Sequence, residues 1–198
     1  MNLAVRKPMT LAEFLVWEAQ QPLRYEFDGN GPVAMTGGTY GHSIIQGNLA
    51  TAVGGRLRGK PCRFHGSDLK LQVAEGHIRY PDGMVLCSPV DRTATVVYDP
   101  VVVFEVLSLS TARDDRIVKA REYPATPSVR RYVMLEQDGV SATVYARSGE
   151  TWTHEILIAD SILSLPEIGV ELPLAELYDG IVFETDRDPD RNPDGELA

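Results

Sequence analysis

Hydrophobic positions along the chain follow two different spacings, and together these predict alternating helices and strands. Apolar residues recur at helical spacing over residues 10–19, 42–58 and 113–123. Thr10 is placed to cap the first of these helices, and Gly59 is placed to end the second. The pattern therefore predicts three helices with strand-like segments between them.

Runs of β-branched and aromatic residues, bounded by turn residues, predict the strands. Residues 25–35 read as a hairpin, because Gly29 and Asn30 supply the backbone angles that tight turns need. Further strands are expected at 62–66, 68–74, 77–86, 101–107, 131–136, 141–147 and 151–158. The last three form a predicted C-terminal β meander.

The order of these elements predicts an α/β fold. From residue 42 to residue 136 the order is α-β-β-β-α-β, which is typical of a mixed β-sheet flanked by helices. An N-terminal helix and hairpin precede this core. We expect residues 1–184 to form a single domain, while residues 185–198 are too polar and proline-rich to bury anything and predict a disordered tail.

Composition limits the partners that this chain can bind. The 198 residues, 43% of them hydrophobic, suffice for one domain with a substantial core. The formal net charge of −9 argues against binding nucleic acid over a broad surface, because such binding requires many Lys and Arg side chains. Any contact with nucleic acid is therefore expected to be local.

Neither an export signal nor a membrane-spanning run is visible in the sequence. We therefore expect a cytoplasmic protein with no membrane partner. Cys62 and Cys87 lack the paired spacing of a zinc site and the density of a disulfide scaffold. Both cysteines are expected to be reduced residues of the core.

Glu105 is the most unusual residue of the pattern, because it lies in the most apolar strand-like run, residues 101–107. An unpaired buried carboxylate costs several kcal/mol, so a partner must hold its charge. One interpretation is a structural ion pair with Arg79 or Arg116. The other is a functional site.

A second acid favours the functional interpretation. Asp82 begins the strand-like run before that of Glu105, and successive strands are usually neighbours in a sheet. Two carboxylates that converge at a sheet edge suit Mg²⁺ or Mn²⁺, and the backbone carbonyl of Val106 is a candidate third ligand. Asp82, Glu105 and Val106 are therefore the predicted metal ligands.

Two lysines compete for the role of a catalytic cation. Lys119, in the helix that follows Glu105, can return to the acids if that helix packs across the sheet. Lys70 lies in a neighbouring strand and can face the same side. Glu26 is a secondary candidate acid, although a hydrogen bond to the turn that follows it is an equal alternative.

These residues together resemble the restriction-endonuclease-like superfamily with its PD-(D/E)xK signature, and more narrowly the Uma-two family. The resemblance rests on Pro81-Asp82, Glu105-Val106-Leu107-Ser108, Asp115 to Lys119 with Tyr123, Tyr25 to Gly29, and His42 through Leu49. It covers about residues 9 to 180. The sequence departs from the signature two positions after Glu105, where Leu107 replaces the usual lysine.

The resemblance implies a metal-dependent endonuclease that hydrolyses phosphodiester bonds, with DNA as the expected substrate and Lys119 in place of the strand lysine. The main alternative is a non-catalytic binding protein that keeps the fold, favoured by the net charge and by Leu107. Hydrolysis of a small phosphoester is a third possibility. Because one such site cuts one strand, and the strands at 141–158 can pair across a two-fold axis, a homodimer is expected.

Overall fold

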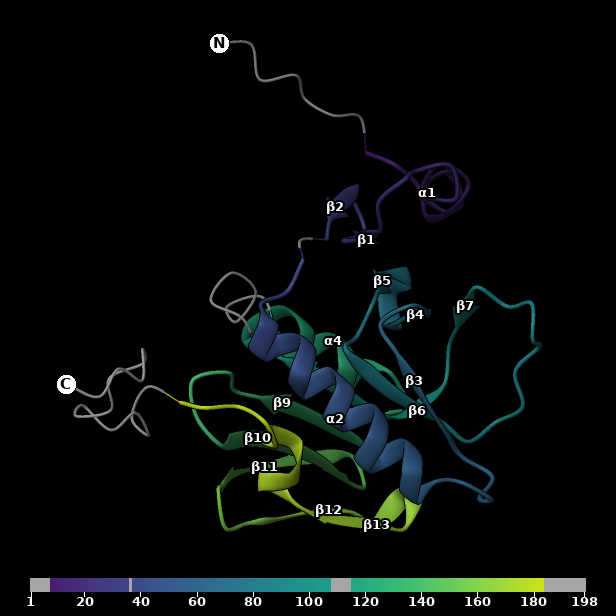
Figure 1. Cartoon of the computed structure of the whole chain (residues 1–198). Helices are drawn as coiled ribbons and strands as arrows, with labels where there is room; N and C mark the ends of the chain where they lie inside the picture. Colours follow the sequence, from purple (N-terminus) through teal and green to yellow (C-terminus); the bar gives the residue numbers. More distant parts are fainter. Residues whose placement is uncertain (1–7, 36, 108–114, 184–198) are drawn as a thin grey trace, which may run out of the picture.

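The computed structural model describes residues 8–35, 37–107 and 115–183 (Figure 1). Within these residues, six strands form the larger sheet in the order β11-β10-β9-β8-β6-β3. They are β3 (Arg63–Gly66), β6 (Gly83–Leu86), β8 (Pro100–Val106), β9 (Arg131–Leu135), β10 (Ser141–Ser148) and β11 (Thr151–Ile158). Strands β8 and β9 are parallel and the other neighbours are antiparallel, so the predicted mixed sheet is confirmed.

A smaller sheet has the order β2-β1-β5-β4-β7. Its strands are β1 (Tyr25–Phe27), β2 (Pro32–Ala34), β4 (Lys70–Gln72), β5 (Ile78–Arg79) and β7 (Val96–Val97). The predicted hairpin at 25–35 is confirmed as β1 and β2. The prediction of one continuous strand over 77–86 is wrong, because this run divides between the two sheets at Pro81, which has no N–H to donate to a ladder.

Helix α2 (Tyr40–Arg56) runs across one face of the larger sheet (Figure 1). It begins two residues before the predicted start, because the Thr39 side chain accepts a hydrogen bond from the backbone N–H of His42 and caps it. Ile45 and Leu49, one helical turn apart, are fully buried against the sheet. The predicted apolar stripe is therefore confirmed as the inner face of this helix.

The N-terminal helix α1 (Leu11–Glu18) has the capping box that the sequence predicts. The Thr10 side chain accepts from the backbone N–H of Glu13, and the Glu13 carboxylate accepts from the backbone N–H of Thr10. Phe14 is buried and stacks on Phe27 with ring centroids 5.0 Å apart. This contact fixes α1 against the β1–β2 hairpin.

Tyr123 of helix α4 (Ala120–Ala125) packs on the other face of the larger sheet, against Val103 and Tyr132. A π-helical turn, η2 (Asp115–Lys119), continues directly into this helix. The predicted helix at 113–123 is confirmed for residues 115–123, and Pro124 lies inside its last turn. In the sequence, Thr111 with Asp114 three residues later is a capping signature for this helix, and both lie outside the described residues.

The chain after β11 forms elements that the sequence did not predict. Strands β12 (Ile162–Leu165) and β13 (Val170–Pro173) make a two-stranded sheet. This segment also contains two short helical turns, η3 (Pro166–Ile168) and η4 (Leu174–Tyr178). A further short turn, η1 (Ala74–Gly76), lies between β4 and β5. Leu163, Leu172 and Leu177 from this segment are buried in the same core as the inner face of α2. The segment is therefore part of the packing of that core.

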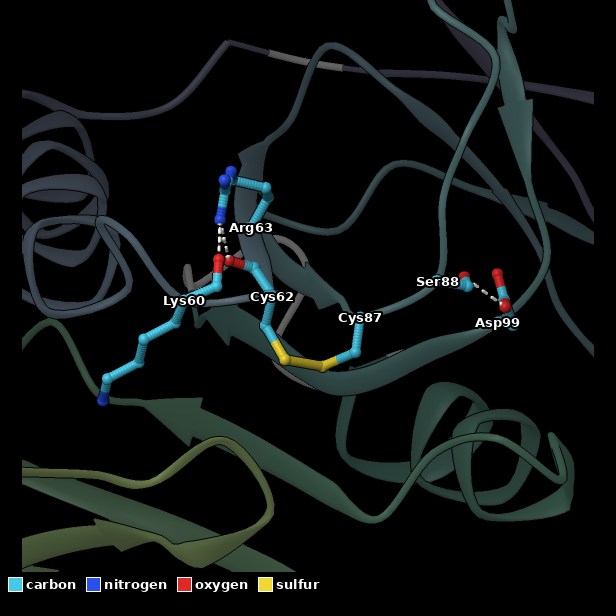
Figure 2. Close-up of a disulfide and its surroundings, with 6 residues drawn as sticks. All are labelled: Lys60, Cys62, Arg63, Cys87, Ser88 and Asp99. Carbon is cyan, nitrogen blue, oxygen red and sulfur yellow. Dashed lines mark hydrogen bonds between the residues drawn. A yellow bond between two sulfur atoms is a disulfide. The ribbon is translucent and has the colours of Figure 1, made fainter.

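Cys62 and Cys87 form a disulfide, so the prediction of reduced cysteines is wrong (Figure 2). Arg63 pairs with Leu86 in the antiparallel register of β3 and β6, which sets the two cysteines directly opposite each other. Spacing alone does not reveal this proximity, because it depends on the register of the hairpin. The predicted tail at 185–198 lies outside the described residues.

Across the described residues, each helix is too short or too polar to cross a lipid bilayer.

Candidate functional site

The two predicted acids lie side by side at one end of the larger sheet. In the antiparallel pair of β6 and β8, Gly83 lies opposite Phe104, and the same register continued by one residue sets Asp82 opposite Glu105. An Asp82 carboxylate oxygen, Oδ2, accepts a hydrogen bond from the backbone N–H of Val106 at 2.7 Å. Asp82 and Glu105 therefore occupy facing positions on neighbouring strands, and both line one cavity.

Glu105 is buried, with only 3% of its surface exposed, and its partners include a cation and a hydroxyl. Its Oε1 lies 2.9 Å from the Lys119 ammonium and accepts a 2.6 Å hydrogen bond from the Tyr123 hydroxyl. Burial, together with the charge of Glu105, raises the pKa of Tyr123 well above its usual range. Tyr123 therefore stays protonated and acts as a donor.

The structural alternative for Glu105 is not what the structure shows. Arg79 binds Glu122 and Glu26, and Arg116 binds Glu136. The cation beside Glu105 is Lys119 instead. Lys119 lies where η2 passes into α4 and also approaches Glu26 Oε1 at 3.5 Å.

Asp82 is held by side chains from α2 as well as by the sheet. Gln46 Nε2 donates to Asp82 Oδ1 at 2.6 Å, and His42 Nε2 lies 3.2 Å from Asp82 Oδ2. His42 and Gln46 are four residues apart and thus share one face of the helix. A Cβ at Gly38 would lie 2.8 Å from His42 Nδ1, so the backbone there packs directly on the ring.

Gln46 is a residue that sequence reasoning missed. His42 reads in sequence as a capping or surface residue, although the capping side chain is that of Thr39. The signal that could have found both was their spacing of four on the polar side of a well-defined amphipathic helix. What sequence could not show is that this side faces Asp82.

Glu26 belongs to an ionic network that includes Arg79 and Lys119. Its oxygens accept from the backbone N–H of Tyr80 and from the Arg79 guanidinium, at 3.2 Å and 3.4 Å. The alternative bond to the following turn is taken by Asp28, whose carboxylate accepts from the backbone N–H groups of Asn30 and Gly31. Glu26 therefore faces the site.

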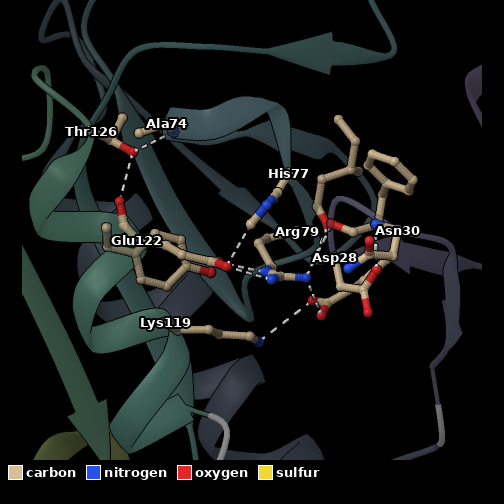
Figure 3. Close-up of polar contacts among 12 residues, drawn as sticks. Asp28, Asn30, Ala74, His77, Arg79, Lys119, Glu122 and Thr126 are labelled. Atoms are coloured by element: carbon tan, nitrogen blue, oxygen red, sulfur yellow. Dashed lines mark hydrogen bonds and ion pairs between the residues drawn. The ribbon is translucent and has the colours of Figure 1, made fainter. Parts of the chain in front are cut away.

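Arg79 joins this network to a further acid, Glu122. Its guanidinium donates two hydrogen bonds of 2.6 Å and 2.7 Å to the Glu122 carboxylate, which His77 also contacts (Figure 3). Burial favours the neutral form of Glu122 and is the largest single effect, but the hydrogen bonds and charges of Arg79 and His77 together outweigh it and lower the pKa of the carboxyl. The network therefore keeps Glu122 charged.

Lys70, the competing lysine, lies elsewhere. Its ammonium is 3.1 Å from Glu18 Oε2 and lies over the Tyr80 ring. Tyr80 in turn donates to Glu18 Oε1 at 2.7 Å. The structure thus brings Asp82, Glu105, Lys119 and Glu26 together and assigns Lys70 to the contact between α1 and β4.

The acid pair forms the floor of a cavity of about 650 Å³. Its walls come from the loop before β1, from β2 and from the start of α2, while β8 and η2 contribute the floor. The lining includes Glu26, His42, Gln46, Asp82, Glu105, Val106 and Lys119 on the polar side, and Pro22, Leu23, Val33, Ala34 and Met35 on the apolar side. This arrangement provides one concave site with convergent polar groups.

The donor set suits a hard divalent cation bound in part by its substrate. Among the described residues, no cluster of three or more His, Cys, Asp or Glu side chains is arranged to hold a metal. A protein nevertheless typically contributes only one or two neighbouring carboxylates to a Mg²⁺ site, and water and phosphate supply the remaining oxygen ligands. Asp82 and Glu105 fit that pattern.

The chain matches a family model described as "Putative restriction endonuclease", Uma2, over residues 11–175. It is 33% identical over 175 residues to the uncharacterized protein slr1290 of Synechocystis sp., covering 86% of this chain and 92% of that protein. The uncharacterized protein sll1609 of the same organism is 27% identical over 154 residues, covering 76% of this chain and 87% of that protein.

A solved structure has the same fold. It is described as "a putative nuclease belonging to DUF820" from Anabaena variabilis, with a TM-score of 0.69 and 19% sequence identity. The match covers 86% of this chain and 98% of that chain. At this identity the likeness concerns the fold.

Proposed function

This chain belongs to the Uma2 family of restriction-endonuclease-like proteins, and on that premise we propose that it is a metal-dependent endonuclease that hydrolyses phosphodiester bonds of DNA. The observation that carries the proposal is that Asp82 and Glu105 face each other across neighbouring strands and line one cavity, with Lys119 beside Glu105. The departure at Leu107 does not remove the cation. Lys119 reaches Glu105 from the helical side of the sheet.

The charge of the site supports a divalent ion. Among the described side chains linked through these contacts, the carboxylates of Glu26, Asp82, Glu105 and Glu122 outnumber the permanent cations of Arg79 and Lys119. Excess negative charge in a partly buried site is costly unless a cation compensates it. A divalent ion matches the difference of two charges.

In the proposed mechanism, Asp82 and Glu105 would hold Mg²⁺ or Mn²⁺, with the Val106 carbonyl as a further ligand. When bound, such an ion would supply Lewis-acid charge near the phosphate and the attacking water. Lys119, as the ammonium, positions the attacking water and balances the charge that develops on the phosphate oxygens, while the proton of that water passes to solvent. Gln46, His42 and the Val106 N–H keep the Asp82 carboxylate in its orientation.

A metal titration combined with a cleavage assay tests this proposal. Calorimetry is expected to show Mg²⁺ or Mn²⁺ binding to the wild-type protein, lost in Asp82→Ala and in Glu105→Ala. Metal-dependent cleavage of labelled DNA, tested as a single strand and as a duplex, should disappear in the same variants. Glu155→Gln, which removes an exposed acid on β11, serves as the matched control and should change neither property.

If the wild-type protein binds neither ion, or binds it equally well after both substitutions, the enzyme proposal fails. That result would favour the non-catalytic binding protein, whereas cleavage of small phosphodiesters without cleavage of DNA would favour the third possibility. Circular dichroism of each variant must match the wild type, so that loss of binding reports the site and not unfolding.

We also propose that the protein acts as a homodimer in the cytoplasm, so that each assembly carries two sites. Strand β11 is at the edge of the larger sheet, and Ile156 and Ile158 on it are 71% and 63% exposed. An exposed apolar edge strand favours pairing with a second copy. Light scattering during size-exclusion chromatography should give twice the monomer mass, and a strict monomer at working concentration would remove the dimer.

A further inference from the structure

We infer that the cavity accepts an unpaired nucleotide, so that the substrate is single-stranded or locally unpaired nucleic acid and not continuous duplex. The inference rests on the proposed function, because it names the substrate class of the same site. It concerns the half of the cavity that the metal chemistry does not use. That half is the apolar wall formed by the loop before β1 and by strand β2.

The size of the cavity is the first argument. A volume of about 650 Å³ is within the usual range for a small-ligand site. A B-form duplex, whose major groove alone is about 12 Å wide, is much larger than such a ligand and cannot be taken into the cavity as a whole. Asp82 and Glu105 lie at the floor, so a phosphate must enter the cavity to reach them.

The chemistry of the wall is the second argument. Leu23 and Val33 are 60% and 45% exposed, although both are large aliphatic side chains, and both line this cavity. Exposed apolar side chains gathered in a concave site indicate a ligand with an apolar face. A nucleobase that has left the stack offers such a face, while a paired base keeps its faces covered by its neighbours.

The position of the wall relative to the acids is the third argument. The polar floor of Asp82, Glu105 and Lys119 and the apolar wall of Leu23 and Val33 belong to one cavity. A nucleotide has the same division, with a charged phosphate joined to a flat base. A phosphate at the floor thus directs the attached base toward the wall.

Charge is the fourth argument. Among the described residues that line the cavity, the permanent cations are Arg24 and Lys119, and both already have acidic partners, Asp68 and Glu105. Duplex binding without base contacts depends on many phosphate contacts along a basic surface. A site with few cations and an apolar wall must gain its affinity from the base.

The test uses three labelled DNA substrates of one sequence: a single strand, a continuous duplex, and a duplex with a central unpaired bulge. With Mg²⁺ or Mn²⁺, we expect the single strand and the bulged duplex to be cut at least about ten-fold faster than the continuous duplex. Cuts in the bulged duplex should map to the unpaired nucleotides. Equal or faster cleavage of the continuous duplex overturns the inference.

Two variants test whether the base contacts the apolar wall of the cavity. Leu23→Ser and Val33→Asp should each raise KM for the single strand about ten-fold, in line with losing one base contact, and change kcat less than two-fold. Val182→Ser, which alters an equally exposed aliphatic residue outside the cavity, is the matched control. Unchanged KM in both wall variants also overturns the inference.

A binding measurement separates this inference from the proposed function. Fluorescence anisotropy of the labelled single strand and duplex, in EDTA and in Ca²⁺, requires no cleavage. Preferential binding of the single strand, weakened by Leu23→Ser, supports the inference even if no metal-dependent cleavage is found and the nuclease proposal fails. Binding of neither form, or tighter binding of the duplex, overturns the inference while leaving the metal titration to judge the nuclease.

Discussion

At the scale of single residues, the site depends on how a buried carboxylate keeps its charge. Glu105 lies in a strand with both faces covered, and its Oε1 contacts the Lys119 ammonium and the Tyr123 hydroxyl. Desolvation of both charges offsets much of their attraction, so the pair itself contributes little net stability. Removing one partner is a different matter, because the other charge then stays buried without compensation.

Lys119→Met should therefore lower the free energy of unfolding by about 3 kcal/mol in metal-free buffer. Glu105→Gln combined with Lys119→Met should cost less than the sum of the two single substitutions, because no uncompensated charge remains. Urea denaturation of the four proteins gives the coupling energy. Additive effects would mean that the two side chains do not interact in solution. The same Lys119→Met protein should have lost DNA cleavage.

The ion pair of Glu122 and Arg79 predicts a dependence of stability on pH. Burial is the largest single effect and opposes the charge of Glu122, but the hydrogen bonds and charges of Arg79 and His77 together hold its folded-state pKa below the ordinary value of 4.5. A lowered carboxyl pKa gives stability that is fully present above the ordinary value and is lost as pH falls through the folded-state pKa. Glu122→Gln should thus be less stable than the wild type by about 3 kcal/mol at pH 7.

This deficit should shrink steadily as the pH falls below 4.5, where the wild-type carboxyl begins to take up its proton. Urea titrations at several pH values between 3 and 7 measure it. Glu150→Gln, in the turn between β10 and β11, supplies the control and should show no comparable deficit. A deficit that stays constant across this range would contradict the charge-based explanation.

At the scale of elements, regular hydrophobic spacing was sufficient to predict most helices and strands. It was not sufficient to predict the contacts between segments that lie far apart in the sequence. The capping box of α1, the inner face of α2 and the meander of β9, β10 and β11 follow from local pattern. The division of residues 77–86 between two sheets does not, because it depends on which neighbour each half finds. The carboxylate pair was predictable since successive strands usually adjoin.

The rest of the site required tertiary information. Gln46 reaches Asp82 across 36 positions of sequence, and the choice between Lys119 and Lys70 depended on helix packing that no local pattern encodes. The disulfide depends in the same way on the register of β3 and β6. Each of these is a contact that only a folded chain defines.

The disulfide between Cys62 and Cys87 leads to a prediction about the stability of the fold. Cys62 and Cys87 enclose a loop of moderate length, with a sequence separation of 25. Closing such a loop stabilises a protein by about 3 kcal/mol, because it lowers the conformational entropy of the unfolded chain. Reduction with dithiothreitol should lower the free energy of unfolding by about this amount. The double variant Cys62→Ser, Cys87→Ser should have the lower value already and should not respond to the reductant. Two free thiols in the unreduced, unfolded protein would contradict the pairing.

At the scale of the whole molecule, the net charge of −9 and the position of the few cations near the cavity determine how binding responds to salt. Each phosphate neutralised on a single strand contributes about −0.7 to the slope of log affinity against log salt. With Arg24 and Lys119 as the permanent cations among the described lining residues, we expect about two such contacts and a slope near −1.4. Affinity for a single strand should then fall only about seven-fold between 50 and 200 mM salt, whereas a protein with six to ten phosphate contacts loses about 10³-fold to 10⁵-fold.

Anisotropy titrations over this range measure the slope, and Arg24→Gln should make it shallower by about 0.7. A slope steeper than about −4 would require a basic surface beyond this cavity, and would place the strand on a different face of the molecule.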